Sequence, residues 1–150
     1  MARAPFEICG QSIKAGTRAT LSLPLPSQSS YTPMSMPIHV IHGKNAGPVV
    51  FISAAIHGDE INGIEIIRRI RHTKAVDKLA GTLICVPTVN VYGFYNNTRN
   101  LPDRRDLNRS FPGSKNGSLA ARVARLFAEE IVDKAAYGID LHTGSNHRAN

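Results

Sequence analysis

Residues 49–64 read VVFISAAIHGDEINGI, a run of apolar and small residues followed by a short polar turn and an isoleucine-rich segment. The run from Val49 to Ile56 is typical of a strand that is buried on both faces of a parallel sheet. The isoleucines that follow Glu60 recur at helical spacing. A buried strand that passes through a turn into a helix predicts an α/β fold.

A second apolar run, residues 82–86, follows this helix and predicts the next strand. A strand, a helix and a strand of this length form a βαβ unit with parallel strands and a right-handed crossover. The helix is expected to begin at residue 59 or 60 and to turn four isoleucines toward the sheet: Ile61, Ile64, Ile67 and Ile70. Residues 38–42 predict an earlier short strand, and the turn at 43–48 favours a hairpin into the central strand.

The N-terminal part of the chain carries one strand signal, an alternation of apolar and polar residues from Ala19 to Leu25. Two prolines near the end of this alternation restrict it to the edge of a sheet or end it. Residues 26–37 are rich in proline and serine and predict a loop. We therefore divide the chain into an N-terminal strand and loop segment, residues 1–37, and a main unit, residues 38–150.

Residues 87–117 form a long segment without periodicity, rich in Asn, Arg, Pro, Gly and Asp. Long irregular loops are uncommon in compact domains and tend to be functional. A helix is expected from Ser118, a good N-cap, to about Lys134. Its apolar stripe consists of Leu119, Val123, Leu126, Phe127 and Ile131. Residues 137–142 predict a short strand that ends on a histidine.

The composition is that of one globular domain, with 150 residues, 42% of them hydrophobic and 19% charged. The net charge of +7 could attract nucleic acid, but the basic residues are mostly scattered and aromatic residues make up only 6%. We therefore expect no nucleic-acid partner, and a site for small anions fits the charge as well. No apolar run is long enough to cross a membrane. The chain begins with no signal segment, and Cys9 and Cys85 suit a structural role, so we expect a reducing cytoplasm.

Two histidines and a glutamate follow predicted strands. His57 and Glu60 leave the central strand three residues apart, and His142 follows another strand. The carboxyl ends of parallel strands meet at one edge of a sheet, so these side chains can converge. A catalytic zinc ion takes three His or carboxylate ligands and keeps a fourth position open. Singly, a strand-end histidine is more often a hydrogen-bonded turn residue, and Glu60 suits the first turn of a helix. The three together favour a metal site that suits one zinc ion, and the same ligands would also suit several other divalent ions.

Ligand histidines usually donate their second ring N–H to a carboxylate or a carbonyl. Asp106 and Asp140 are candidates for this role. Asp140 shares a strand face with His142 two residues away, but it could instead cap a neighbouring turn. Asp59 could also serve, although its position suits a helix N-cap.

Asn108 and Arg109 lie in the long irregular segment, in a stretch bounded by proline and glycine. An amide and a planar guanidinium can together clamp a carboxylate. Arg99, earlier in the same segment, could polarise a carbonyl group or hold an oxyanion. Arg104 and Arg105 are expected to be solvated surface residues.

Three motifs of this chain resemble, in order, those of the succinylglutamate desuccinylase/aspartoacylase family of zinc carboxypeptidase-like hydrolases: HGDE at 57–60, DLNR at 106–109 and DLHTG at 140–144. The resemblance implies a zinc carboxypeptidase-like α/β fold, with a mixed, largely parallel sheet flanked by helices. It makes residues 38–150 the N-terminal part of the zinc hydrolase catalytic domain.

The resemblance also implies a role for each candidate residue. It makes His57, Glu60 and His142 the zinc ligands. It assigns the substrate carboxylate to Asn108 and Arg109, the polarised carbonyl to Arg99, and the orientation of the first histidine ligand to Asp106.

One feature of the family is not found here. The resemblance places the catalytic general base, a glutamate, beyond the third zinc ligand, whereas the last glutamate of this chain is Glu130. We therefore expect the chain to be truncated relative to the complete catalytic domain. Such a chain should leave a sheet edge or apolar helix faces uncovered, and uncovered surfaces of this kind promote association. We therefore keep a homo-oligomer as one alternative to a monomer.

The expected function is zinc-dependent hydrolysis of the amide bond of N-acyl amino acids or related small amides. The expected partner is thus a small amide substrate that bears a carboxylate. Two alternatives remain: a zinc carboxypeptidase that acts on peptide C-termini, and a metal- or carboxylate-binding module without turnover.

Overall fold

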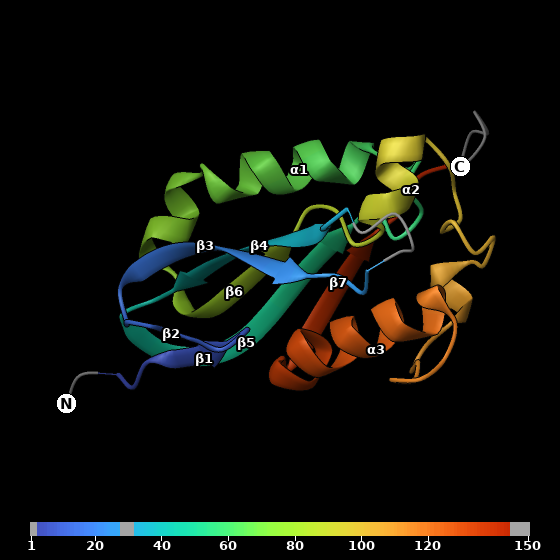
Figure 1. The fold of residues 1–150 in the computed structure, drawn as a ribbon. Helices are drawn as coiled ribbons and strands as arrows, with labels where there is room; N and C mark the ends of the chain where they lie inside the picture. Colours follow the sequence, from blue (N-terminus) through green and yellow to red (C-terminus); the bar gives the residue numbers. More distant parts are fainter. Residues whose placement is uncertain (1–2, 28–31, 145–150) are drawn as a thin grey trace.

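The computed structural model describes residues 3–27 and 32–144. These residues contain strands β1 (Phe6–Ile8), β2 (Gln11–Ile13), β3 (Thr17–Pro24), β4 (Ser35–His42), β5 (Asn45–Ala54), β6 (Ala80–Val86) and β7 (Tyr137–Leu141). The α-helices are α1 (Asn62–Arg71), α2 (Val91–Asn96) and α3 (Leu119–Glu130) (Figure 1). Short 3-10 helices are η1 (Lys74–Lys78), η2 (Leu107–Arg109) and η3 (Val132–Lys134).

The main sheet has five strands in the order β3-β4-β6-β5-β7, and β1 and β2 form a separate antiparallel pair. The pairs β3-β4 and β4-β6 are antiparallel, whereas β6, β5 and β7 run parallel. The predicted α/β fold with a mixed sheet is confirmed. So is the βαβ unit, because α1 connects the parallel neighbours β5 and β6. β3 lies at one edge of the sheet, as its prolines indicated.

The predicted hairpin between β4 and β5 is wrong. These strands follow one another in sequence, but β6 lies between them and pairs with both. The turn that joins them therefore crosses over the end of β6. At this crossing a Cβ on Gly43 would lie 2.0 Å from the carbonyl oxygen of Leu79, so glycine is required there.

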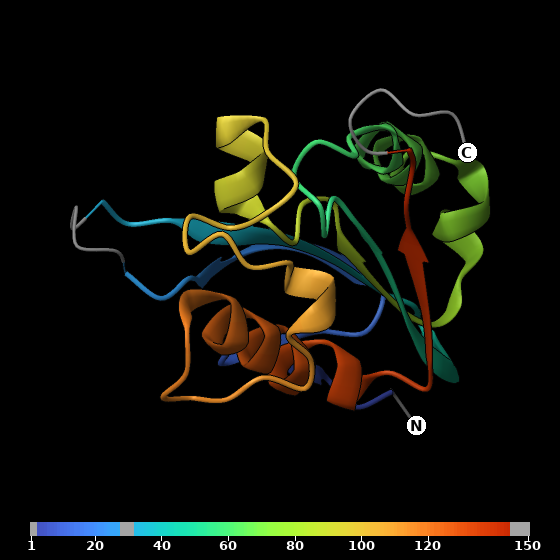
Figure 2. The same cartoon turned by 90° about the vertical axis from the view of Figure 1, so that its right-hand side faces the viewer.

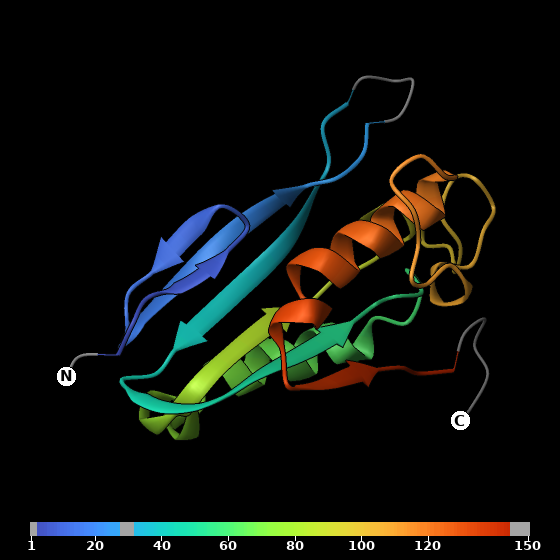
Figure 3. The ribbon, with the colours of Figure 1, turned by 90° about the horizontal axis from the view of Figure 1, so that it is seen from below.

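Helices cover the two faces of the sheet. α1 lies on one face, and α3 lies on the opposite face (Figures 1 and 2). The β1-β2 pair lies on the same side of the sheet as α3 (Figure 3). The core under α3 includes Phe127 and Ile131, both from the predicted apolar stripe. Ser118 caps α3 as predicted, since its hydroxyl oxygen accepts a hydrogen bond from the backbone N–H of Ala121 at 3.2 Å. A smaller core under α1 contains Ile67 and Ile52.

Helix α1 begins later than expected, at Asn62. Ile67 is fully buried, but Ile61 precedes the first helical turn and is 51% exposed, so its predicted contact with the sheet is wrong. Gly63 lets α1 approach closely, because a Cβ there would lie 2.7 Å from the Cβ of Ala54 and 2.9 Å from that of Leu141. This approach keeps the start of α1 against the carboxyl ends of β5 and β7.

Strand β7 is the second edge of the sheet as described, and it exposes Tyr137 and Ile139. An exposed apolar edge of this kind is what the sequence led us to expect, and the association that it would promote stays a prediction. Among the described residues, no helix is long and apolar enough to cross a membrane. The division of the chain at residues 37 and 38 also stays a prediction, and β3 from the first segment pairs with β4 along its whole length.

Candidate metal centre

Strands β5 and β7 are parallel neighbours, and this pairing brings two candidate histidines to one edge of the sheet. Ala54 lies beside Leu141 in the register of the two strands. His57 and His142 follow these residues closely in sequence, so both rings leave the sheet at its carboxyl edge. This is the edge where open α/β sheets bind their ligands.

The turn after β5 has a strained and closely packed backbone. Ala55 has a φ of +50°, a left-handed conformation that is uncommon for a residue with a Cβ. Its carbonyl accepts a hydrogen bond from the backbone N–H of Asn90 at 2.9 Å. A Cβ on Gly58 would lie 2.0 Å from the carbonyl carbon of Gly93, so only glycine fits where the turn meets α2. Such strain persists where surrounding contacts enforce it, and it is common at functional sites.

His57, Glu60 and His142 converge at this edge. Nδ1 of His57 lies 2.8 Å from Oε1 of Glu60, and Nδ1 of His142 lies 2.9 Å from Oε2. One candidate ligand atom from each residue lies within 4.8 Å of the others. His57 and Glu60 are buried, whereas the side chain of His142 is 36% exposed, which leaves the cluster accessible from one side. Two imidazoles and a carboxylate with an open side are the donor set of a catalytic zinc site.

Each of the two imidazoles has a carboxylate on its far side. Nε2 of His57 lies 3.2 Å from Oδ1 of Asp106, and Nε2 of His142 lies 2.8 Å from Oδ2 of Asp140. A ring whose Nε2–H donates to a carboxylate presents the lone pair of Nδ1 on the opposite side. Both lone pairs are then directed toward Glu60, so the residues present fit a divalent cation held by two nitrogens and a carboxylate.

Arg99 lies beside this cluster and contacts two of its carboxylates. It donates one hydrogen bond to Oε1 of Glu60 at 3.2 Å and another to Oδ2 of Asp106 at 3.1 Å. Burial raises the pKa of Asp106, but hydrogen bonding by Arg99 and the adjacent His57 outweigh it, and the pKa lies below its ordinary value. Asp106 therefore stays ionised and can accept from both neighbours.

Asn90 fixes the backbone that carries Arg99, and the sequence analysis missed it. Its side chain is fully buried. Its Oδ1 accepts from the N–H of Gly93 at 2.8 Å, and its Nδ2 donates to the carbonyl of Arg99 at 3.1 Å. The N–H of Gly58 donates to the same carbonyl at 3.4 Å. The available signal was an asparagine soon after a buried strand, a favoured N-cap for the short helix α2.

Asn108 and Arg109 belong to η2, which is tied to the cluster through Asp106. The backbone N–H of Asn108 donates to Oδ1 of Asp106 at 2.9 Å. Both side chains are exposed, and neither makes a hydrogen bond or ion pair with any residue in the described ranges. They are thus free to bind a ligand. Arg104 and Arg105 are exposed, as predicted.

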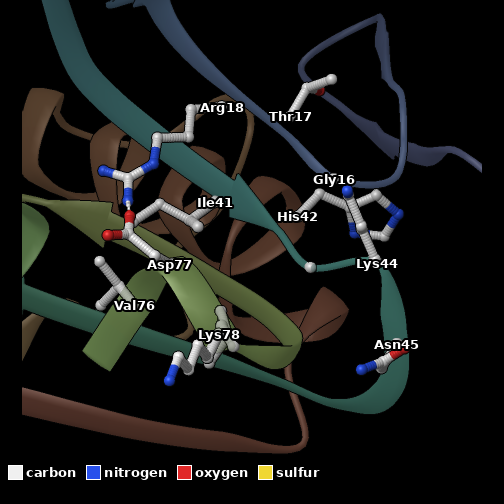
Figure 4. Close-up of a pocket in the computed structure, with 12 residues that line it drawn as sticks. Gly16, Thr17, Arg18, Ile41, His42, Lys44, Asn45, Val76, Asp77 and Lys78 are labelled. Atoms are coloured by element: carbon white, nitrogen blue, oxygen red, sulfur yellow. Dashed lines mark hydrogen bonds and ion pairs between the residues drawn. The ribbon is translucent and has the colours of Figure 1, made fainter. Parts of the chain in front are cut away.

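The described cavities are lined by other residues than those of this cluster. One, of about 380 Å³, lies at the amino end of β5, whereas His57 follows the carboxyl end of that strand. The ion pair of Arg18 with Asp77 forms part of its wall, and Lys44 and Lys78 extend on different sides of it (Figure 4). None of the candidate site residues lines any of these cavities. The candidate site is therefore identified by its cluster of ionisable side chains.

Within the described residues the cluster offers three candidate ligands, and one side of it is accessible. A catalytic zinc site has three protein ligands and one open position. A cation held there would lie close to the guanidinium of Arg99, which contacts the same Glu60 carboxylate. Two adjacent positive groups favour a substrate oxygen that gains negative charge during a reaction.

Comparisons with known proteins agree with this picture. The model of the succinylglutamate desuccinylase/aspartoacylase catalytic domain matches residues 46–150. The N-alpha-acetyl-L-2,4-diaminobutyric acid deacetylase of Halomonas elongata is 30% identical over 126 residues, which cover 83% of this chain and 36% of that protein.

Solved structures share the fold. A succinylglutamate desuccinylase/aspartoacylase from Rhodobacter sphaeroides matches with a TM-score of 0.77 and 28% identity, over 85% of this chain and 40% of that one. The product-bound ectoine utilization protein EutE from Ruegeria pomeroyi matches with a TM-score of 0.72 and 31% identity, over 85% of this chain and 40% of that one. The chain thus spans well under half the length of these relatives. Since the family model matches well over half of this chain, the chain belongs to the succinylglutamate desuccinylase/aspartoacylase family.

Proposed function

We propose that this chain provides the metal centre of a zinc-dependent hydrolase that cleaves the amide bond of N-acyl amino acids or related small amides. The observation that carries the proposal is the convergence of His57 and His142 on Glu60, each with Nδ1 toward the glutamate and Nε2 toward a carboxylate. The relative from Halomonas elongata is named as a deacetylase of an N-acetylated diamino acid, which supports an amide substrate. Because the chain covers only 36% of that protein, the activity of the whole protein is part of the proposal.

The metal would supply the Lewis acidity that amide hydrolysis needs: bound zinc polarises a carbonyl oxygen and lowers the pKa of water. His57, Glu60 and His142 would hold it, and Asp106 would keep the ring of His57 in the tautomer that leaves Nδ1 free. The buried position of His57 and Glu60 excludes water from one side of the cluster and strengthens its electrostatic interactions.

Arg99 is suited to stabilise the oxygen of the scissile amide. Its guanidinium has five N–H donors, and the contacts to Glu60 and Asp106 use two of them. The remaining donors are available to the carbonyl oxygen, on which negative charge develops when water attacks the amide. Asn90 holds the backbone of Arg99 in place for this role.

Asn108 and Arg109 are suited to bind the carboxylate of the amino acid. A guanidinium can bind a carboxylate through two parallel hydrogen bonds, and an amide N–H adds a third donor. Their backbone is anchored to Asp106, which also contacts His57, so the carboxylate site has a fixed relation to the metal site. The net charge of +7 favours the approach of an anionic substrate.

The experiment that tests this function measures amine release from a panel of N-acetyl and N-succinyl amino acids. It uses the 150-residue chain and a form extended at its C-terminus, each supplied with one equivalent of zinc. We expect the extended form to release amine, and chelation of zinc to abolish the release. If the zinc-loaded extended form cleaves none of these amides, the hydrolase proposal is wrong, and a metal-binding module without turnover remains.

A variant of the carboxylate site sharpens this test. Arg109→Ala should raise KM about 10- to 100-fold, because hydrogen bonds to a charged group contribute about 1.5–3 kcal/mol. Arg105→Ala removes an exposed arginine from the same segment and should leave KM unchanged. Equal KM values for the two variants would rule out Arg109 as the carboxylate ligand.

A further inference from the structure

Ser53 lies in β5, directly beside Asp140 of β7 in the register of the two parallel strands. Its side chain is 1% exposed, and its Oγ donates a hydrogen bond to Oδ1 of Asp140 at 2.7 Å. The other oxygen of the same carboxylate, Oδ2, lies 2.8 Å from Nε2 of His142. A continuous chain of contacts therefore runs from a buried hydroxyl near the carboxyl end of β5 to the third candidate ligand.

We propose that Ser53 is a positioning residue of the metal centre, which fixes the carboxylate of Asp140 and thereby the ring of His142. This inference rests on the proposed metal site, to which it adds a residue that makes no contact with the metal ligands themselves. Ser53 acts through Asp140, and its hydroxyl selects the orientation in which Oδ2 faces the imidazole.

The two histidines differ in a way that explains why His142 needs this support. The side chain of His57 is only 3% exposed, so the surrounding atoms hold its ring. The side chain of His142 is 36% exposed, and it follows β7, which among the described residues pairs with β5 alone. Packing therefore holds the His142 ring much less firmly, and hydrogen bonds must determine its orientation.

The side chain of Asp140 is itself loosely packed. Its side chain is 30% exposed, and the terminal torsion of an aspartate is broad and roughly two-fold. Without a second contact the carboxylate can rotate and exchange His142 for water. The hydrogen bond from Ser53 fixes one oxygen and leaves the other for Nε2 of His142. Nδ1 of that ring then faces Oε2 of Glu60 at 2.9 Å.

A purely structural role for Ser53 is the competing explanation, because a buried hydroxyl needs a hydrogen-bond partner wherever it lies. The two explanations differ in what the loss of the hydroxyl changes. A structural role affects only the free energy of unfolding. A positioning role also affects how tightly, and in what geometry, a metal ion is held.

Ser53→Ala and the rescue variant Ser53→Thr test the proposal, with Thr82→Ala as the matched control. Thr82, on the adjacent strand β6, also has a buried hydroxyl, and its Oγ1 lies 2.8 Å from Nδ1 of His42. In the register of β5 and β6 it lies beside Val49, about 13 Å along the sheet from Ser53 at roughly 3.3 Å per residue. It therefore tests the loss of a buried hydroxyl far from the metal centre.

Zinc affinity of the full chain is measured by competition with a chelator, and the visible absorption spectrum of the cobalt(II)-loaded protein reports the ligand geometry. Outer-shell partners typically change metal affinity about 10- to 100-fold, so Ser53→Ala should weaken zinc binding about 10-fold. It should also alter the cobalt spectrum. Ser53→Thr should restore both properties, and Thr82→Ala should leave both unchanged.

Two outcomes would overturn the inference, and a third concerns the metal site itself. If Ser53→Ala binds zinc as tightly as the wild type, with the same cobalt spectrum, Ser53 has no positioning role. The same conclusion follows if Thr82→Ala weakens binding equally, because the effect would then reflect general destabilisation. If the wild type binds no zinc, the proposed metal site fails, and the inference fails with it.

Discussion

Nε2 of His57 lies 3.2 Å from Oδ1 of Asp106, while Nδ1 on the other side of the same ring lies 2.8 Å from Oε1 of Glu60. The imidazole is therefore held from both sides by carboxylates. The hydrogen bond to Asp106 fixes the tautomer, and it leaves Nδ1 free for the cation that His57 and Glu60 would share.

Asp106→Asn should lower zinc affinity about 10- to 100-fold, the range typical of partners behind a metal ligand. An amide has one oxygen where the carboxylate has two. Whichever way it turns, either His57 or Arg99 then meets an NH₂ donor instead of an acceptor. Competition with a chelator measures the affinity.

Asp133→Asn is the matched control, since it removes the same charge from an exposed position in η3. It should leave zinc affinity unchanged. Equal affinities for both variants and the wild type would contradict the role of Asp106.

Arg99→Ala should lower kcat about 10²- to 10³-fold at saturating zinc, the cost typical of losing one donor to a developing oxyanion. KM should change less, because the interaction strengthens as charge develops on the oxygen. Steady-state kinetics of N-acyl amino acid hydrolysis by the C-terminally extended form measures both constants. Arg105→Ala, in the same segment, should retain wild-type kinetics, and a matching loss of kcat in that variant would show that the effect is not specific to Arg99.

Gly58→Ala should destabilise the fold by about 1–3 kcal/mol, the usual cost of forcing atoms into a packed site. The new Cβ would lie 2.0 Å from the carbonyl carbon of Gly93, so the backbone of α2 has to move. Gly117→Ala is the comparison and should cost less, because its Cβ would lie 2.4 Å from the Oγ of Ser114, which can rotate away, and 2.8 Å from the Cβ of Ala121. Urea denaturation measures both, and an equal loss of stability in the two variants would show that the contact with α2 is unimportant.

His39 should make stability depend on pH. It lies on β4, where its Nδ1 is 3.0 Å from Oγ1 of Thr20. Burial, and then the charge of Arg71, lower its pKa from 6.5 to about 4. Between these values the unfolded chain binds a proton that the folded chain does not bind. The contribution of neutral His39 is therefore present above pH 6.5 and is lost as the pH falls toward 4.

The measurement compares the free energy of unfolding of the wild type and His39→Gln over this pH range. Since His39 is partly exposed, the wild type should lose on the order of 1 kcal/mol relative to the variant as the pH falls. A difference between the two proteins that stays constant with pH would contradict the lowered pKa.

Residues 49–64 were enough to predict the α/β fold, because a buried strand and an amphipathic helix both leave local patterns. Strand pairing leaves no such pattern. The position of β6 between β4 and β5 depends on contacts between distant residues, so the hairpin prediction was wrong. Helix α2 was missed because it has only six residues, too few to show helical periodicity.

The sequence predicted the part of the candidate site that depends on the order and direction of the strands. His57 and His142 each follow a strand of one parallel pair, which accounts for their convergence, and the predicted family is confirmed. The contacts that support the candidate ligands were harder to predict from the sequence. Asn90 acts through the carbonyl of Arg99, and Ser53 acts through Asp140 across two strands. Neither contact leaves a spacing that the sequence alone reveals.

Zinc binding by the wild-type chain, compared with Glu60→Gln and with the control Glu65→Gln, tests the central claim most directly. Glu60 lies between both histidines, whereas Glu65 forms exposed ion pairs on α1. Equilibrium dialysis followed by metal analysis should find one zinc per chain in the wild type and in Glu65→Gln, and greatly weakened binding in Glu60→Gln. No stoichiometric zinc in the wild type, or equal binding by all three proteins, would contradict the account.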